Sequence, residues 1–284
     1  MRHIDEDTIT QAVIARHAAA ADPRLRELMT SLVQHLHAFA REVQLTEAEW
    51  AGGLRFLGEC ARAGGSNADA RHELALLSDT LGLSALVAAF DRRRARGSTE
   101  RAMPAAFHLD GAACATPVDG DSGFEGESCF VRGRVRSADD NAPIAGAEVR
   151  VWPSGVQGEG GAVVVCRSDG EGGFVARCAL AQAHTIPHDG PVGRLLESLG
   201  RHAWRPAHLH VMITASGYER LLTHVFRQGG RYLDSDAVFG VRGSLVAEWV
   251  QHASGRTPDG RMSREPFTTL DFAFVLNPAR GDKP

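Results

Sequence analysis

The hydrophobic periodicity of the chain changes once along its length, and this change limits the folds open to it. Up to about residue 96, apolar residues recur at three- and four-residue steps, as in amphipathic helices. From Cys129 onward, short runs alternate apolar and polar residues between turn signals such as Asp169-Gly170, which is typical of antiparallel strands. The sequence therefore predicts an all-β core, an antiparallel sandwich or barrel, preceded by an N-terminal α-helical segment.

The same change predicts the domain boundaries. We expect a helical domain over residues 1–96, a linker over 97–127 that is rich in Gly, Pro, Ala and acidic residues, and a β-sandwich domain over 128–284. Asp22-Pro23 is typical of a helix start, and Thr46-Glu47-Ala48-Glu49 fits a capping box. The expected helices cover about 8–20, 23–43, 47–63 and 68–94. The expected strands cover 129–135, 147–152, 162–166, 173–178, 209–215, 220–226, 238–242 and 267–275.

Composition excludes several functional classes. The net charge is −4, so we expect no nucleic-acid partner, and the polar start MRHIDEDTIT predicts neither a signal peptide nor membrane association. The five cysteines show no CxxC spacing, which is typical of a soluble cytoplasmic protein with reduced thiols. Lys283 is the only lysine, which argues against a Schiff-base enzyme.

Two histidines form the first candidate site. Arg205-Pro206-Ala207-His208-Leu209-His210 leads into a strand-like segment. Because side chains at i and i+2 of a strand point to the same face, His208 and His210 should project together, as two ligands of one metal ion do. Spacing alone leaves open a second interpretation, a pair of hydrogen-bonded histidines without metal.

Longer blocks around this pair carry a family resemblance. GRHAWRPAHLHVMITASGYERLLTHVF, followed by YLDSDAVFGV, resembles the signature of the intradiol ring-cleavage dioxygenases, in particular the hydroxyquinol 1,2-dioxygenase branch. The likeness runs from about Thr8 to Asn277. It implies a ferric ion held by two tyrosinates and two histidines, the latter at His208 and His210. It also implies a homodimer formed by the N-terminal helices, where a hydrophobic channel can hold a lipid tail.

The chain departs from the family at both tyrosinate positions. A family block resembling YPIPTDGPVG reads HTIPHDGPVG here, so that His184 replaces the tyrosine. The loop after Trp152 reads PSGVQGEGGAVVV and also lacks tyrosine. Tyr218 and Tyr232 are the only tyrosines, and both fall at non-ligand positions of the family pattern. A ferric bis-tyrosinate centre cannot be built from these residues.

His184, His208 and His210 are therefore the predicted ligand set, because imidazole at the tyrosinate position keeps a metal-binding group. Two phenolates compensate the charge of Fe(III), whereas three neutral imidazoles favour a divalent metal. Iron is the metal that the family implies, with Fe(II) favoured over Fe(III), and zinc, copper or manganese are alternatives. Cys166 or water could complete the site.

Two further residues are predicted to be catalytic. Arg205 matches a family position whose guanidinium stabilises an anionic substrate or intermediate; the alternative is a salt bridge to Asp234 or Asp236. His224 matches a polar position beside the metal site, where it would orient a ligand or act as acid or base; the alternative is a packing residue.

Three functions remain open at this point. The first is an enzyme that acts with O2 on a small catechol- or hydroxyquinol-type aromatic through the atypical metal centre. The second is a metal-dependent hydrolase or lyase on the same fold, in which the metal activates water. The third is a catalytically inactive family member, which the lost tyrosines favour.

Overall fold

The structure is a computed structural model that describes residues 4–63, 73–90, 97–102, 127–156 and 161–279. It consists of two compact units, Met1–Glu59 and Cys60–Pro284, and the boundary in the sequence falls within helix α3 (Glu47–Ala63). The predicted break at 64–67 lies outside the described residues, and so does most of the predicted linker. Within the described ranges, every helix is too short or too polar to span a lipid bilayer.

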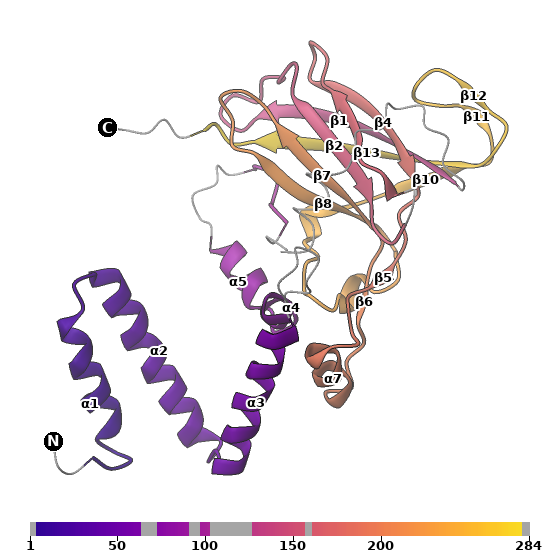
Figure 1. Cartoon of the computed structure of the whole chain (residues 1–284). Coiled ribbons are helices and arrows are strands. Elements are labelled where there is room, and N and C mark those ends of the chain that lie inside the picture. Colours follow the sequence, from indigo (N-terminus) through magenta and orange to yellow (C-terminus); the bar gives the residue numbers. More distant parts are fainter. Residues whose placement is uncertain (1–3, 64–72, 91–96, 103–126, 157–160, 280–284) are drawn as a thin grey trace. The chain divides into compact units, whose positions relative to one another are not determined.

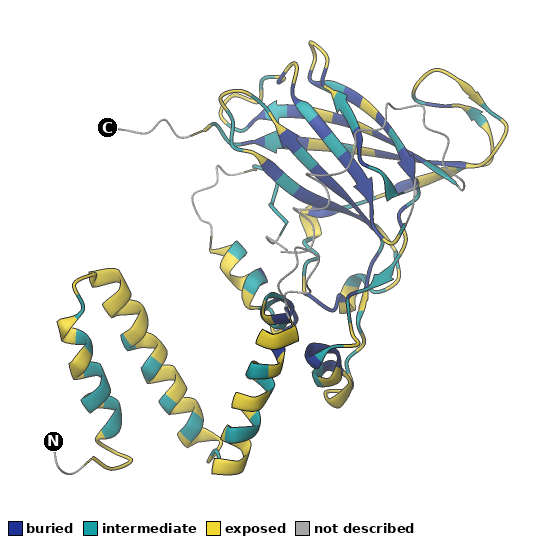
Figure 2. Ribbon diagram, in the orientation of Figure 1, coloured by how far each residue is buried: buried dark blue, intermediate teal, exposed yellow. Residues whose placement is uncertain are grey.

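The first unit contains α1 (Ile9–Arg16), the 3-10 turn η1 (His17–Ala19), α2 (Pro23–Glu42) and the start of α3. The helix starts predicted from the sequence are confirmed: the Asp22 side chain accepts the N–H of Arg24, and Thr46 and Glu49 bond reciprocally. None of the residues of α2 is buried within the chain (Figure 2). Its exposed apolar side chains are Leu25, Leu28, Met29, Leu32, Leu36 and Phe39.

The second unit is built on two β-sheets (Figure 1). One has the order β3-β2-β7-β8-β9 and the other β10-β13-β1-β4. Apolar side chains from both sheets form one buried cluster, so the sheets pack face to face as a sandwich. The strands of the sandwich are β1 (Ser128–Ser137), β2 (Glu148–Pro153), β3 (Val164–Arg167), β4 (Gly173–Ala179), β7 (His208–Thr214), β8 (Leu221–Arg227), β9 (Val246–Ala247), β10 (Trp249–His252) and β13 (Phe267–Leu276).

Most neighbouring strands are antiparallel, as the sequence predicts, but β1–β13 and β8–β9 are parallel. Parallel pairs need a long connection, and both pairs have one because their partners are far apart in the chain. The fold prediction, a β core preceded by a helical segment, is confirmed.

Shorter elements surround the sandwich and carry part of the candidate site. They are α4 (Glu73–Thr80), α5 (Leu83–Ala89), β5 (His184–Thr185), α7 (Pro191–Ser198), β6 (Trp204–Arg205), η3 (Leu233–Ser235), η4 (Gly243–Leu245), β11 (Gly255–Arg256) and β12 (Met262–Ser263). β5 and β6 pair with each other as a two-stranded ribbon.

One predicted strand, 238–242, is wrong. This segment is a turn in which Phe239 has a positive φ of 57°, and the Asp236 carboxylate accepts the backbone N–H groups of Val238 and Gly240. These two hydrogen bonds hold the segment as a turn, so it does not join a sheet.

Candidate metal centre

Three buried histidines meet on the adjacent strands β7 and β8. His208 and His210 lie two residues apart on β7, and the antiparallel register puts His224 of β8 directly opposite His210. Their exposed fractions are 0%, 3% and 4% for His208, His210 and His224. The predicted projection of His208 and His210 to one face is therefore found, and His224 joins them from the neighbouring strand.

The three imidazole rings form a nearly equilateral triangle. The ring centroids of His208 lie 4.6 Å from those of His210 and His224, and the last two are 4.7 Å apart. One nitrogen of each ring lies within 4.8 Å of those of the other two. In the part of the chain that the structure describes, this is the one group of three metal-ligating side chains gathered so closely.

His208 is oriented by its backbone surroundings. Its Nδ1–H donates to the carbonyl oxygen of Pro206 at 2.8 Å, so Nε2 carries the lone pair. That Nε2 atom is buried and has no hydrogen-bond partner among the described residues. Burial, followed by the neighbouring charges of His224, Arg205 and His210, holds the pKa of His208 well below its ordinary value. His208 is therefore a neutral imidazole, the form that binds metals.

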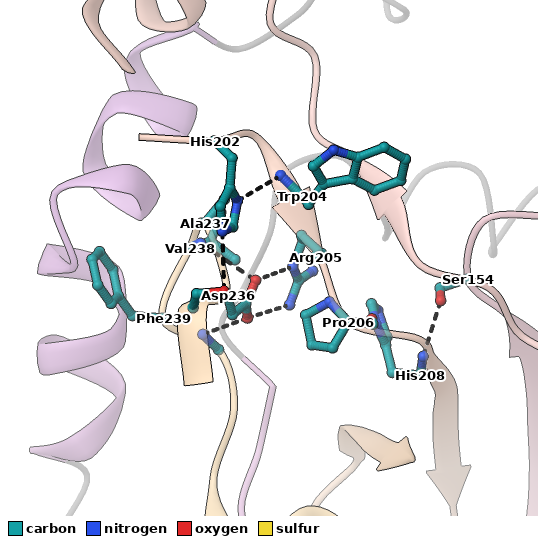
Figure 3. Close-up of polar contacts among 12 residues, drawn as sticks. Ser154, His202, Trp204, Arg205, Pro206, His208, Asp236, Ala237, Val238 and Phe239 are labelled. Atoms are coloured by element: carbon teal, nitrogen blue, oxygen red, sulfur yellow. Dashed lines mark hydrogen bonds and ion pairs between the residues drawn. The ribbon is translucent and has the colours of Figure 1, made fainter. Parts of the chain in front are cut away.

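The end of β2 fixes the start of β7. Ser154 donates its N–H to the His208 carbonyl at 2.9 Å. Its hydroxyl accepts the N–H of His208 at 3.0 Å (Figure 3). The indole of Trp152 stacks on the ring of His210, with centroids 5.0 Å apart and planes within 5°. The Ser154 bonds fix the backbone at His208, and the stacked indole restricts the ring of His210.

His184 lies beside the group but outside it. Its ring centroid is 5.5 Å from that of His208, and its backbone pairs with Arg205 between β5 and β6. Burial, assisted by the nearby Arg205 charge, lowers the pKa of His184 to about 4. Its Nδ1 atom is buried without a hydrogen-bond partner among the described residues. Metal binding by His184 stays a prediction.

Arg205 forms a buried salt bridge with Asp236, whose side chains are 4% and 2% exposed (Figure 3). Nε donates to Oδ1 at 3.0 Å and Nη2 to Oδ2 at 3.3 Å. The salt bridge that the sequence offered as an alternative is thus present, with Asp236 and not Asp234 as the partner. A role of Arg205 toward substrate stays a prediction.

Two protein-family models together match most of the chain. The model described as "Catechol dioxygenase N terminus" matches residues 22–99, and the one described as "Dioxygenase" matches residues 104–278. The chain belongs to the intradiol ring-cleavage dioxygenase family. This family uses non-haem iron.

Relatives of this dioxygenase-family chain include proteins of similar length. It is 47% identical to the 6-chlorohydroxyquinol 1,2-dioxygenase of Cupriavidus pinatubonensis, over 98% of this chain and 99% of the relative. It is 38% identical to the hydroxyquinol 1,2-dioxygenase of Nocardioides simplex, over 96% of both chains. The crystal structure of hydroxyquinol 1,2-dioxygenase from Pseudomonas putida DLL-E4 matches with a TM-score of 0.86 and 36% identity, over 96% of this chain and 99% of that one.

Both tyrosines of this family member are engaged in local contacts. Tyr232 stacks on Trp204 with centroids 5.3 Å apart, and Tyr218 packs against the core of the sandwich. Cys166, the cysteine that we considered as a fourth ligand, lies on β3, where burial raises the pKa of its thiol to about 11. The protonated thiol is a poor metal ligand.

The donor set fits a metal ion, because a buried Nε2 lone pair of His208 with no hydrogen-bond partner lies beside two further imidazoles. Sequence reasoning assigned His224 a position next to the metal site but did not place it opposite His210. The turn at Ser216-Gly217 contains the missing signal. In a hairpin centred on Gly217, residues at equal distances from the turn, as His210 and His224 are, lie opposite each other.

Proposed function

We propose that this chain is an oxidoreductase that acts with O2 on a hydroxyquinol-type aromatic at a metal centre made of imidazoles, in place of a ferric bis-tyrosinate centre. The proposal depends mainly on one observation, the buried cluster of histidines beside Arg205. The proposal is further supported by the full-length similarity to a 6-chlorohydroxyquinol 1,2-dioxygenase and a hydroxyquinol 1,2-dioxygenase.

His208 and His210 would hold the metal, together with a third imidazole from His184 or His224. Since neutral ligands leave the charge of the ion uncompensated, Fe(II) is favoured over Fe(III), and zinc, copper or manganese are alternatives. When bound, such an ion supplies a Lewis acid for the aromatic diol and open positions at which substrate and O2 meet.

The protein supplies charge and orientation around that ion. Asp236 takes two of the five N–H donors of the Arg205 guanidinium, which leaves donors for an anionic aromatic or for a carboxylate product. Because Asp236 fixes the guanidinium in a buried position, Arg205 can present these donors without first being ordered.

We further propose that the chain forms a homodimer through its N-terminal helices. The exposed apolar residues of α2 are about half accessible to water in the single chain, and packing against a second copy would bury them. A lipid tail between the helices is a second occupant that suits such an apolar surface. The match of residues 22–99 to the catechol dioxygenase N-terminal model supports this assignment.

Oxygen consumption by metal-loaded protein tests the proposed activity. The protein is loaded with Fe(II) without air and then mixed with hydroxyquinol, chlorohydroxyquinol or catechol in an oxygen electrode. We expect substrate-dependent oxygen uptake that is lost in His208→Ala, with hydroxyquinol-type substrates preferred.

Two results would contradict the proposal. Metal binding without oxygen uptake, combined with turnover of ester or lactone substrates, would favour a metal-dependent hydrolase or lyase. Absence of both metal binding and turnover would favour a non-catalytic family member, the function that the tyrosine substitutions independently suggest.

A further inference from the structure

We infer that the third imidazole ligand of the metal site is His224, and that His184 lies outside the ligand set. This inference rests on the proposed function only for the presence of a metal at His208 and His210. It does not depend on the substrate or on the reaction.

The distances distinguish the two candidates. The nitrogens of His208, His210 and His224 lie within 4.8 Å of one another, whereas His184 does not belong to this group. Metal–nitrogen bonds of about 2.1 Å put two ligand nitrogens at most about 4 Å apart. Small changes in side-chain torsion can therefore bring His224 into the same coordination sphere as the His208–His210 pair.

The strands that carry the two candidate ligands also favour His224 over His184. β7 and β8 are inner strands of the five-stranded sheet, and His224 is held by the ladder directly opposite His210. His184 belongs to β5, a strand of only two residues that pairs solely with β6. A ligand on a rigid inner strand needs less reorganisation on metal binding than one on a short ribbon.

Burial also favours His224. His224 is 4% exposed, while His184 is only partly buried. A ring buried among two other imidazoles is desolvated on folding, so metal binding adds little further desolvation cost at this ring. The resulting set of three neutral nitrogens suits divalent zinc, copper, cobalt or iron better than a ferric ion.

Titration with Co²⁺, followed by visible absorption, tests the assignment without any turnover. The variants are His224→Gln, His184→Gln and His208→Gln, with His252→Gln as a matched control, since His252 bonds Thr269 on the other sheet. We expect His224→Gln and His208→Gln to lower the Co²⁺ affinity more than about 100-fold, beyond the range of changes next to a metal site. His184→Gln should lower it less than about 10-fold, and the control should leave it unchanged.

Electron paramagnetic resonance of bound Cu²⁺ gives a second measurement on the same proteins. Coupling to three nitrogens in the unmodified chain should become coupling to two in His224→Gln. His224→Asn serves as a second variant if His224→Gln does not fold, as judged by circular dichroism.

The opposite order would overturn the inference: loss of Co²⁺ affinity in His184→Gln with His224→Gln close to the unmodified protein. Failure of the unmodified protein to bind Co²⁺ or Cu²⁺ would overturn it as well. Failure of the proposed function is distinguishable, because it would leave metal binding dependent on His224 intact but without oxygen uptake.

Discussion

Arg205 and Asp236 are charged residues almost completely removed from water. Removing one partner of such a pair leaves the other charge buried and uncompensated, at a cost of about 3–5 kcal/mol. We therefore expect Asp236→Asn to lower the free energy of unfolding by that amount, as measured by urea denaturation. The matched control is Asp271→Asn, which removes the exposed partner of Arg132 and should cost less than about 1 kcal/mol. Equal losses in the two variants would contradict this account of Arg205.

Cys166 gives a prediction that depends on pH. Burial raises the pKa of its thiol to about 11 from 9.0, so the thiolate fraction at pH 8 falls by about 100-fold. Alkylation of Cys166 by iodoacetamide, followed by peptide mass spectrometry, should be slower in the folded protein by at least this factor than in urea. The rate should rise with pH until about pH 11. Equal rates in folded and unfolded protein would show that the thiol is accessible and ionised normally.

At the scale of elements, α7 begins without a capping side chain of its own. Its N-cap is Gly190, and the N–H of Val192 instead donates to the carboxylate of Glu73 on α4, at 3.0 Å. Glu73 is 1% exposed, and a Cβ on Gly190 would lie 2.0 Å from Glu73 Oε1, so the carboxylate fills the place of a side chain there. Glu73 therefore anchors the segment that follows His184.

We expect Glu73→Ala to lower the free energy of unfolding by about 1–3 kcal/mol, since it leaves a buried N–H without an acceptor. Glu73→Gln keeps an acceptor oxygen and should recover part of this loss. Urea denaturation measures both. Glu27→Ala, at an exposed residue paired with Arg24, is the control and should change stability by less than about 1 kcal/mol. A Glu73→Ala protein as stable as this control would contradict the anchoring role.

The elements also show what could be predicted from the sequence. Helix caps and strand alternation act over a few residues, so the starts of α2 and α3 and most strands of the sandwich were predictable. The turn at 238–242 was not, because its backbone N–H groups bond to the Asp236 carboxylate two and four residues earlier, a local contact that competes with strand formation and that hydrophobic alternation does not reveal. β10, whose four residues pair with β13, was also missed. His208 and His210 follow from i, i+2 spacing, whereas the approach of His224 depends on strand register.

At the scale of the whole molecule, the apolar surface of α2 predicts self-association. Leu32 is 49% exposed, and Leu32→Glu would place a charge in the proposed dimer interface. We expect analytical ultracentrifugation to find a dimer for the unmodified chain and a monomer for this variant. Gln34→Glu, an exposed polar position of α2, should remain dimeric. A monomeric unmodified protein at micromolar concentration would contradict the proposed homodimer.

The central claim, a metal centre of imidazoles without tyrosinate, is tested most directly by metal analysis with the visible spectrum of freshly purified protein. The account predicts about one divalent metal ion per chain, lost in His208→Ala, and no tyrosinate-to-iron absorption band. A red protein with ferric iron, whose colour disappears in Tyr232→Phe or Tyr218→Phe, would contradict it.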